Sequence, residues 1–290
     1  MKSEKETISA SIVAFNNTYE EVKAVVDCLL QSDRVKRIVV IDHSPSIELA
    51  TISEHCTVKY IHNPSNPGFG AGHNVALNEP ERTEDFHLIL NPDVSFNLQT
   101  IENLCTFAIA NPNAGICIPK ILNTDGTVQH LLKLLPTPLT FPVRRLPALA
   151  AFKHSINQKF ELHQIDQKRP SEINVVSGCF AFIKGVAITA GCRFDERFFL
   201  YFEDFDLTRQ ITRTYKAYYV PTATAYHKYG NGSRHSTRLL FVAITSYIRY
   251  FNKWGWFLDR DRQLRNKAAL NRMATEQTDA DAARQDPSSS

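Results

Sequence analysis

The stretch FHLILNPDVSF, Phe86 to Phe96, joins an apolar run to a single carboxylate, Asp93. The apolar run is typical of a buried strand, and Pro92 fixes the backbone just before the carboxylate. Open α/β sheets bind their ligands beyond the carboxyl ends of their strands. Asp93 is therefore our first candidate for a binding residue.

A second group of acids lies among aromatic residues in YFEDFDLTRQI, where Glu203, Asp204 and Asp206 alternate with Phe and Tyr. Burial among aromatic rings raises the pKa of a carboxyl group and suits it to act as a general base. A helix that begins here would stabilise the same acids through its dipole, and this interpretation covers Asp206. For Glu203 and Asp204 both interpretations stay open.

His227 lies in VPTATAYHKYGNGS, near the end of an expected strand. A lone histidine is more often structural than functional. If the fold brings His227 near Asp93, however, an imidazole and a carboxylate together suit Mg²⁺ or Mn²⁺ with help from phosphate oxygens.

A glycine-rich loop, NPSNPGFGAGHN, contains Gly68, Gly70 and Gly72. Such a loop lets the backbone approach a ligand, and a helix that begins near Ala71 would direct its amides at an anion. The loop lacks the Lys-Ser/Thr of a P-loop, and it does not match G-x-G-x-x-G. Neither an ATPase nor a dinucleotide enzyme is favoured, and a plain tight turn is the alternative.

Five expected strands alternate with helices in the first 120 residues, which predicts an α/β fold with a mostly parallel sheet and helices on both faces. Polar residues gather after the strands. These strands are 8–15, 34–46 (with polar and proline turn residues at its end), 57–62, 86–90 and 114–119, and the helices are 19–32, 71–78 and 98–110.

The rest of the chain is less regular. Residues 134–150 contain four prolines and indicate a long loop rather than a domain boundary. The α/β pattern resumes over 171–232, with strands at 173–177 and 216–221 and a helix near 186–190. We expect one catalytic domain over 1–232, a basic helical extension over 233–272 and a disordered tail over 273–290.

The bulk composition is that of an ordinary globular protein, with 43% hydrophobic residues in 290. Six scattered cysteines indicate reduced thiols rather than disulfides or a zinc site. No signal peptide is visible, and the longest apolar run is too short to span a bilayer. We expect a cytoplasmic protein.

The positive charge is concentrated near the C-terminus. Residues 228–272 contain ten Lys or Arg and two Asp, a net charge of +8 within a total of +3. From Leu240, apolar residues recur at helical spacing to Leu258, interrupted by Gly255. Such a helix either contacts an anionic membrane on the inner face or packs on the domain with a solvated basic face. No nucleic-acid motif accompanies it, so we expect no nucleic-acid partner.

The motifs AFNN, VVIDHS, NPSNPGFGAGHN, LILNPD, SGCFAFIKG, FDERFFLYFEDFDLTRQI and VPTATAYHKYGNGS occur in an order that resembles family 2 glycosyltransferases with a GT-A fold. The branch that they resemble most is the bacterial O-antigen and lipopolysaccharide rhamnosyltransferase type. The resemblance runs from Ile8 to the mid-250s.

The resemblance implies a role for each matching residue. Asp93 would hold a divalent metal, Mg²⁺ or Mn²⁺, with His227, and Asn91 stands where the first acid of a D-x-D motif would be. Asp204 would be the catalytic base, with Glu203 as the next candidate, and Asp42 would contact the pyrimidine base. The other implied donor-binding residues are Ala14, Phe15, Asn66, Gly68, Gly70, Asn74 and Gly178.

The implied function is inverting, metal-dependent glycosyl transfer from a nucleotide sugar to a lipid-linked or lipopolysaccharide glycan. The branch implies L-rhamnose from dTDP-L-rhamnose, and a UDP-linked galactose or N-acetylglucosamine would use the same residues. Because Asn91 and His43 depart from the family pattern, a non-catalytic sugar-nucleotide-binding scaffold is a further alternative. A nucleotide-dependent oxidoreductase is disfavoured by the missing dinucleotide fingerprint.

Overall fold

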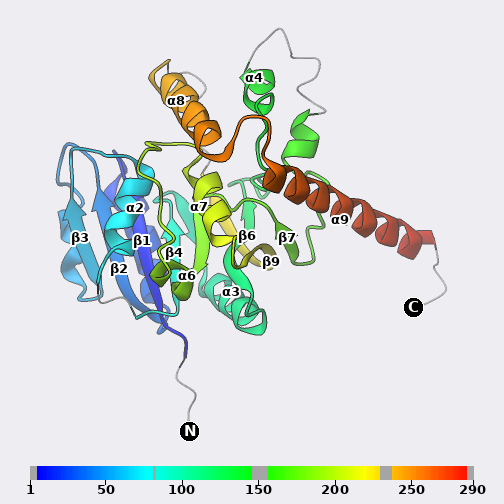
Figure 1. Ribbon diagram of the computed structural model, residues 1–290. Helices are drawn as coiled ribbons and strands as arrows, with labels where there is room; N and C mark the ends of the chain where they lie inside the picture. Colours follow the sequence, from blue (N-terminus) through cyan, green and yellow to red (C-terminus); the bar gives the residue numbers. More distant parts are fainter. Residues whose placement is uncertain (1–4, 81–82, 146–155, 229–236, 286–290) are drawn as a thin grey trace.

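The structure is a computed structural model that describes residues 5–80, 83–145, 156–228 and 237–285. These residues form a sheet of nine strands in the order β3-β2-β1-β4-β8-β6-β9-β5, with β7 paired to β9. Helices cover both faces of the sheet; near the C-terminus, one further helix lies above the sheet and another extends from its side (Figure 1). The strands are β1 (Ile8–Ala14), β2 (Val35–Asp42), β3 (Val58–His62), β4 (Phe86–Leu90), β5 (Val94–Phe96), β6 (Ala114–Leu122), β7 (Ser171–Ile173), β8 (Phe180–Lys184) and β9 (Lys216–His227).

The α-helices of the sheet domain follow the strands in the alternation that the sequence predicts. They are α1 (Tyr19–Leu30), α2 (Phe69–Leu77), α3 (Leu98–Ala110), α4 (Thr140–Arg145), α6 (Gly185–Thr189) and α7 (Glu203–Ile211). The two C-terminal helices are α8 (Thr237–Trp254) and α9 (Arg260–Gln285). A short 3₁₀ helix, η1, spans Ala50–Glu54.

The first half of the chain forms a parallel sheet, as expected. β1 pairs in parallel with β2 and β4, and β2 pairs in parallel with β3. All residues of β1 and β4 are buried, because helices pack on both faces of these strands. Local capping sets the helix starts: Thr18 and Glu21 form a capping box on α1, and Asn97 caps α3. The carboxyl ends of these strands therefore lie at one edge of the sheet.

The second half of the sheet is mixed. β8 runs antiparallel to β4 and β6, whereas β9 runs parallel to β6. The sequence analysis missed β5, which has only three residues. It also placed a strand at 173–177, whereas β7 covers Ser171–Ile173. It ended a strand at Pro221, but β9 continues to His227 because a register shift opposite Pro119 and Lys120 accommodates the proline.

The described part of the proline-rich segment, residues 134–145, is hydrogen-bonded to the C-terminal helices. Asn266 of α9 accepts from the backbone N–H of Leu135 and donates to its carbonyl, at 2.9 and 2.8 Å. The Tyr247 hydroxyl of α8 donates to the Pro138 carbonyl at 2.7 Å. Part of the segment, residues 146–150, lies outside the described residues. The described part thus belongs to the body of the domain.

The C-terminal extension is two helices joined at Gly255, whose φ of +95° only glycine adopts easily. A buried ion pair joins it to α7, because Arg209 contacts both oxygens of Asp259 at 2.7 and 3.0 Å. The expectation of a disordered tail from residue 273 differs from the structure, where α9 continues to Gln285. Ala, Glu, Gln and Arg in this stretch favour the helix.

All six cysteines are unpaired, as expected for reduced thiols. None of the helices in the described part of the chain is both long and apolar enough to cross a bilayer.

Candidate active site

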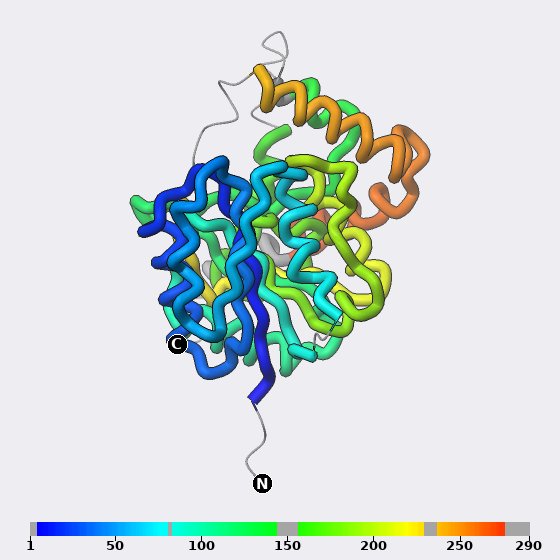
Figure 2. The backbone as a smooth tube through the Cα atoms, turned by 90° about the vertical axis from the view of Figure 1, so that its left-hand side faces the viewer, coloured from blue at the N-terminus to red at the C-terminus, as the bar shows by residue number. Residues whose placement is uncertain are grey.

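A cleft of about 480 Å³ opens at the carboxyl edge of the parallel strands, between the sheet and the N-terminal turns of α8. Figure 2 shows α8 crossing above this edge of the sheet. Segments from both halves of the chain line the cleft. The lining residues are Val13, Phe15, Asn17, His43, Asn66, Phe69, Asn91, Pro92, Asp93, Phe199, Leu200, Arg238, Leu239 and Val242.

Asp93 lines this cleft, and His227 lies directly beside Asp93, although the two residues are far apart in the sequence. β5 pairs with the end of β9, so that Val94 lies opposite His227, and the N–H of Lys228 donates to the Asp93 carbonyl at 3.1 Å. This pairing leaves Asp93 Oδ1 at 3.3 Å from His227 Nε2. Asn91 Nδ2 lies at the same distance from this nitrogen. The three residues of the predicted metal site are therefore together.

Gln129 determines which nitrogen of His227 carries the proton, and the Asn91 amide lies beside the other nitrogen. The Gln129 side-chain oxygen lies 3.0 Å from His227 Nδ1, and its amide nitrogen donates to the His227 carbonyl at 2.7 Å. Because an amide oxygen only accepts, Nδ1 carries the proton and Nε2 presents a lone pair. This is how metal-binding histidines are usually oriented.

The residues present fit a divalent cation. Asp93 Oδ1 is buried and makes no hydrogen bond, although it faces the Nε2 atom of His227. An unsatisfied buried carboxylate oxygen is costly unless a cation occupies the space beside it. Within residues 5–80, 83–145, 156–228 and 237–285, no three His, Cys, Asp or Glu side chains are placed to hold a metal ion. The remaining ligands would be water and donor phosphate oxygens.

The acidic pair lies at the start of α7. Tyr201 and Phe202, which precede the helix, adopt left-handed φ angles of 69° and 68°. Such angles are strained in residues other than glycine and are found mainly at functional sites. They introduce Glu203 and Asp204 directly after a sharp turn, among the aromatic side chains that the sequence analysis noted.

The two acids differ in their surroundings. Burial, together with the negative charge of Asp204, raises the pKa of Glu203 well above its usual range, and Glu203 Oε2 has no hydrogen-bond partner. Burial also raises the pKa of Asp204, whereas the positive charge of Lys133 and backbone N–H groups oppose this rise. Asp204 Oδ1 accepts from the N–H of Phe205 at 2.8 Å. More neighbouring groups therefore favour the charged form of Asp204 than that of Glu203.

Gly178 and Cys179 lie between the Asn91–Asp93 segment and Asp204. The Cys179 carbonyl accepts from the N–H of Asn91 at 2.9 Å. A Cβ at Gly178 would lie 4.0 Å from the Asp204 Cβ and 2.9 Å from the ring of Phe69. Burial raises the pKa of Cys179 to about 12, and the charges of both Asp93 and Asp204 add to this rise. Asp93 and Asp204 therefore flank the same two residues.

Asp42 does not reach the cleft, contrary to its expected contact with a pyrimidine base. It is fully buried, and its two oxygens accept from the N–H of Ser44 and from the Tyr60 hydroxyl at 2.9 and 2.8 Å. The adjacent His43 lines the cleft instead, although its Nε2 faces Gly72. Asp42 orders the turn that carries His43.

Ala14 and Phe15 lie beside this turn. The Ala14 carbonyl accepts from the N–H of His43 at 2.8 Å and is thereby used within the fold. The Phe15 side chain is 51% exposed and forms one wall of the cleft, where it offers a flat apolar surface. Of these two expected donor-binding residues, the structure places only Phe15 at the cleft.

The glycine loop packs the two halves of the chain together. A Cβ at Gly68 would lie 2.4 Å from the Phe199 carbonyl oxygen, and one at Gly70 would lie 2.7 Å from the Phe194 side chain. Asn74 is buried and bonds to the backbone N–H and carbonyl of Phe194. Asn66 lines the cleft, whereas Gly68, Gly70 and Asn74 do not; Asp204, Gly178 and His227 also lie outside its lining.

Three side chains near the site were missed by the sequence analysis. Gln129 orients His227, and Arg238 of α8 lines the cleft. Lys133 lies 5.7 Å above the Phe205 ring, and its positive charge opposes the rise in the pKa of Asp204. Arg238 was counted only as part of the basic segment. No local pattern marks Gln129 or Lys133, because their positions depend on packing between distant segments.

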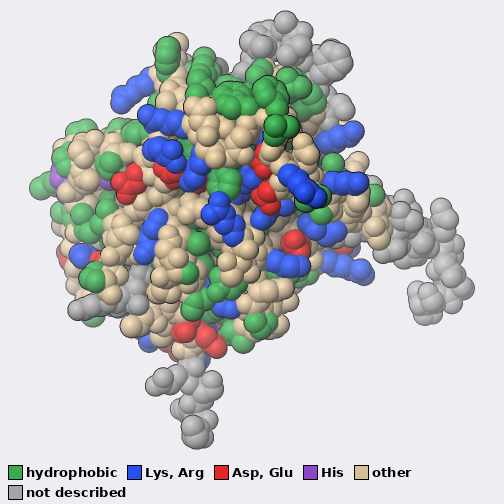
Figure 3. Space-filling model, in the orientation of Figure 1, with side chains coloured by type: hydrophobic (Ala, Val, Ile, Leu, Met, Phe, Trp, Pro, Cys, Tyr) green, Lys and Arg blue, Asp and Glu red, His purple; other side chains and the backbone are tan. Residues whose placement is uncertain are grey.

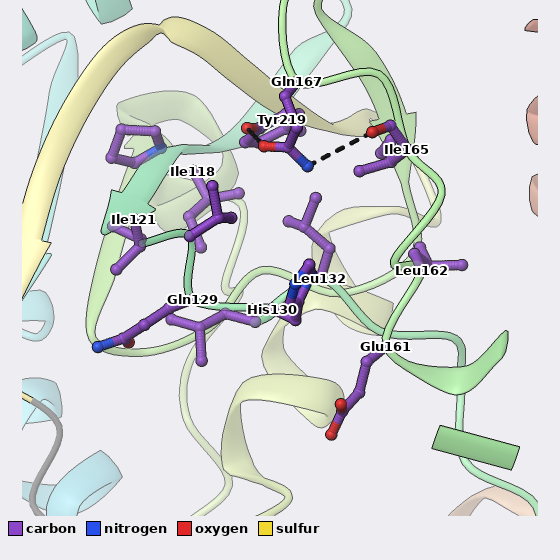
Figure 4. Close-up of a pocket in the computed structure, with 13 residues that line it drawn as sticks. Ile118, Ile121, Gln129, His130, Leu132, Glu161, Leu162, Ile165, Gln167 and Tyr219 are labelled. Atoms are coloured by element: carbon purple, nitrogen blue, oxygen red, sulfur yellow. Dashed lines mark hydrogen bonds between the residues drawn. The ribbon is translucent and has the colours of Figure 1, made fainter. Parts of the chain in front are cut away.

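A second hollow lies beneath β6, beside Gln167 and Tyr219 (Figure 4). Apolar residues such as Ile118 and Leu132 line most of it. The Tyr219 hydroxyl donates to the Gln167 side-chain oxygen at 2.7 Å. Its volume of about 10 Å³ is at the limit for one water molecule. It is a packing defect and not a ligand site.

The chain is similar in sequence to known proteins. The chain is 26% identical over 191 residues to N-acetylglucosaminyl-diphospho-decaprenol L-rhamnosyltransferase from two strains of Mycobacterium tuberculosis, CDC 1551 / Oshkosh and H37Rv. The match covers 61% of this chain and 61% of each relative. The chain therefore spans less than two thirds of the length of these relatives.

Solved structures support the fold. A crystal structure of GalNAc-T7 with UDP, GalNAc and Mn²⁺ superposes with a TM-score of 0.63 at 15% identity, over 90% of this chain and 50% of that one. A structure of S. aureus TarS 1-349 gives a TM-score of 0.52 at 15% identity, over 77% of this chain and 60% of that one. The profile described as glycosyl transferase family 2 matches residues 9–188. By this match over more than half of its length, the chain belongs to glycosyl transferase family 2.

Proposed function

We propose that the protein is an inverting, metal-dependent glycosyltransferase that transfers L-rhamnose from dTDP-L-rhamnose to a lipid-linked glycan. The observation that carries this proposal is the pair formed by Asp93 Oδ1 and His227 Nε2, 3.3 Å apart at the cleft wall. Asp204 lies on the other side of Gly178 and Cys179. Membership of family 2 supports the reaction class, and the name of the mycobacterial relatives supports the sugar and the lipid-linked acceptor.

The cleft wall favours a diphosphate that gains negative charge as it leaves the sugar. Mg²⁺ or Mn²⁺ held by Asp93 and His227 would neutralise this charge. Asn91 lies beside them, at the position where a D-x-D motif has its first acid, and contributes no negative charge. The guanidinium of Arg238 lines the same cleft and makes no hydrogen bond or ion pair with the described residues. Arg238 supplies further positive charge to the diphosphate.

Asp204 acts as the general base. The acceptor hydroxyl loses its proton as its oxygen attacks the anomeric carbon, and the carboxylate of Asp204 takes this proton. Burial raises its pKa, which increases its strength as a base, and the positive charge of Lys133 opposes part of this rise. Glu203 is buried and favours the protonated form, so that it is the weaker candidate. A single base without a second nucleophile gives one displacement, with inversion.

The experiment incubates the purified protein with dTDP-L-rhamnose and a short-chain polyprenyl-diphospho-N-acetylglucosamine, with and without Mn²⁺. Parallel reactions use UDP- and GDP-sugars. We expect metal-dependent release of dTDP. Asp204→Asn is expected to reduce turnover by about 10²- to 10⁴-fold, the usual contribution of a general base, and to leave dTDP binding unchanged by calorimetry.

The matched control is Asp27→Asn, which alters an exposed acid of α1. It should retain turnover. If Asp204→Asn and the original chain release nucleotide at the same slow rate, the protein is a non-catalytic binder. Turnover only with a UDP-sugar would retain the reaction class and overturn the choice of rhamnose.

A further inference from the structure

Helix α8 is apolar on two faces, but only one of them packs on the domain. Its inner face is buried through Ala243, Tyr250 and Phe251. Its outer face exposes Phe241 by 75%, and Leu240, Ile244 and Ile248 are also exposed. A helix that is apolar all round is normally buried on every side. The outer face of α8 therefore lacks a partner within the described residues.

The exposed apolar surface extends beyond the helix. Phe257 and Leu258, just after α8, are exposed by 75% and 97%, and Leu139, just before α4, is exposed by 71%. Figure 3 shows hydrophobic side chains gathered at the top of the molecule, over α8 and α4, with Lys and Arg side chains below them. Contiguous apolar patches of this kind mark interaction sites.

The charges around this surface are positive. Residues 237–258 contain two arginines and a lysine and no acid. Lys253 is turned inward, where it pairs with Asp195 and Asp206 at 2.7 Å. Arg260, just after Leu258, makes no ion pair with the described residues, and the adjacent Asp259 is paired with Arg209. A free cation beside an apolar face complements an anionic lipid surface rather than a neutral one.

The outer face is also continuous with the cleft. Arg238, Leu239 and Val242 line the cleft from the same turns of α8 that expose Leu240 and Phe241 outward. A lipid surface on the outer face would thus be separated from the cleft, which Asp93 also lines, by the width of α8. This arrangement suits an acceptor whose glycan is attached through a diphosphate to a lipid chain.

We propose that the outer face of α8, with Phe257 and Leu258, docks on an anionic bilayer and places the cleft beside lipid-linked acceptors. The proposal deepens the proposed function and rests on its lipid-linked acceptor. The apolar side chains enter the headgroup region, and Arg260 contacts lipid phosphates. The charge pattern of the sequence indicates a basic contact face, whereas the structure directs an apolar face outward.

The test measures sedimentation of the purified protein with vesicles of phosphatidylcholine, with and without phosphatidylglycerol, in the absence of any substrate. We expect binding to the anionic vesicles, and at least a tenfold loss of binding in Phe241→Ser/Ile248→Ser. Arg260→Gln is expected to weaken binding about fivefold, because a basic residue near an anionic surface contributes about 1 kcal/mol.

The matched control is Val186→Ser, which alters a half-exposed apolar residue on α6, at the opposite end of the sheet (Figure 1). It should bind vesicles like the original chain. Thermal melting of each variant checks that the fold is intact. With an acceptor embedded in vesicles, Phe241→Ser/Ile248→Ser should lose turnover, while turnover of a short-chain soluble acceptor should be unchanged.

Unchanged vesicle binding in Phe241→Ser/Ile248→Ser would overturn the proposal. The proposal would also be overturned if the original chain did not bind vesicles but formed a dimer, and Phe241→Ser/Ile248→Ser dissociated this dimer. A second copy of the chain would then cover the face. Vesicle binding without any glycosyl transfer would sustain the docking surface and count against the proposed function alone.

Discussion

Asp42 and Asn74, in the parallel half of the sheet, use their carboxylate and amide differently from Asp93 and Glu203, which lie around its mixed half. In the parallel half, Asp42 has both oxygens bonded to the turns around it, and Asn74 uses its amide to hold Phe194. Around the second half, Asp93 Oδ1 and Glu203 Oε2 are buried without hydrogen-bond partners. Fully bonded groups stabilise the scaffold, whereas unsatisfied buried groups indicate where a ligand or proton belongs.

This contrast separates residues that share a motif from residues that share a site. Asp42 and Asn74 match family motifs as clearly as Asp93 does, yet only Asp93 lines the cleft. Three changes test the contrast.

The largest effect is expected for Asp93→Asn. Loss of this ligand should lower turnover by about a thousandfold, or about 4 kcal/mol of transition-state stabilisation, and removal of metal with EDTA should then have little further effect. Steady-state rates with and without EDTA measure both effects.

The matched comparison for Asp93→Asn is Asp42→Asn. It places an NH₂ group against the bonding partners of a buried carboxylate, so it should lower the free energy of unfolding by about 1–3 kcal/mol in urea titrations. Turnover of the folded fraction should persist. Equal loss of turnover in both variants would contradict the contrast.

A smaller effect is expected for Gln129→Leu, which leaves His227 Nδ1 without its acceptor. Partners of this kind usually change metal affinity by about 10- to 100-fold, so Mn²⁺ binding in the presence of dTDP should weaken by this factor. Electron paramagnetic resonance of free Mn²⁺ measures the affinity without turnover. Gln129→Glu keeps an oxygen at the same place and should retain Mn²⁺ binding. If it does not, Gln129 does not act by orienting His227.

The smallest effect is expected for Lys133→Met, and it appears as a shift of the pH profile of kcat/KM. The pKa of Asp204 is raised by burial and held down by Lys133. Because the base must be ionised, kcat/KM falls as the pH drops through this pKa. Loss of the cation raises the pKa further, so the acid limb should move to higher pH.

Lys168→Met, which alters an exposed lysine, is the control for this measurement. Its pH profile should coincide with that of the original chain. A profile of Lys133→Met that does not move, or that moves to lower pH, would exclude Asp204 as the titrating base.

Much of the fold was predictable because its signals are local. The helix at 98–110 and the strand at 86–90 have the bounds expected from their periodicity. β5 was missed because three residues are too few to show a pattern, and the end of β9 was missed because the register shift that accommodates Pro221 depends on its neighbour β6.

The site was predictable only in part. The types of residue identified Asp93, Asp204 and His227 as candidates, and the resemblance supplied their roles. The sequence could not show that the oxygens of Asp42 are used internally, because Tyr60 approaches from another strand. It also could not show that α8 covers the cleft, because α8 lies beyond residues 9–188, where the family profile matches.

The short pairing of β5 with β9 has a consequence for biosynthesis. Because Asp93 and His227 are joined only through this pairing, the metal corner stays incomplete until the ribosome has released β9 and the last strand has docked. A chain that ends before β9 lacks His227, and with it one of the two proposed cation ligands.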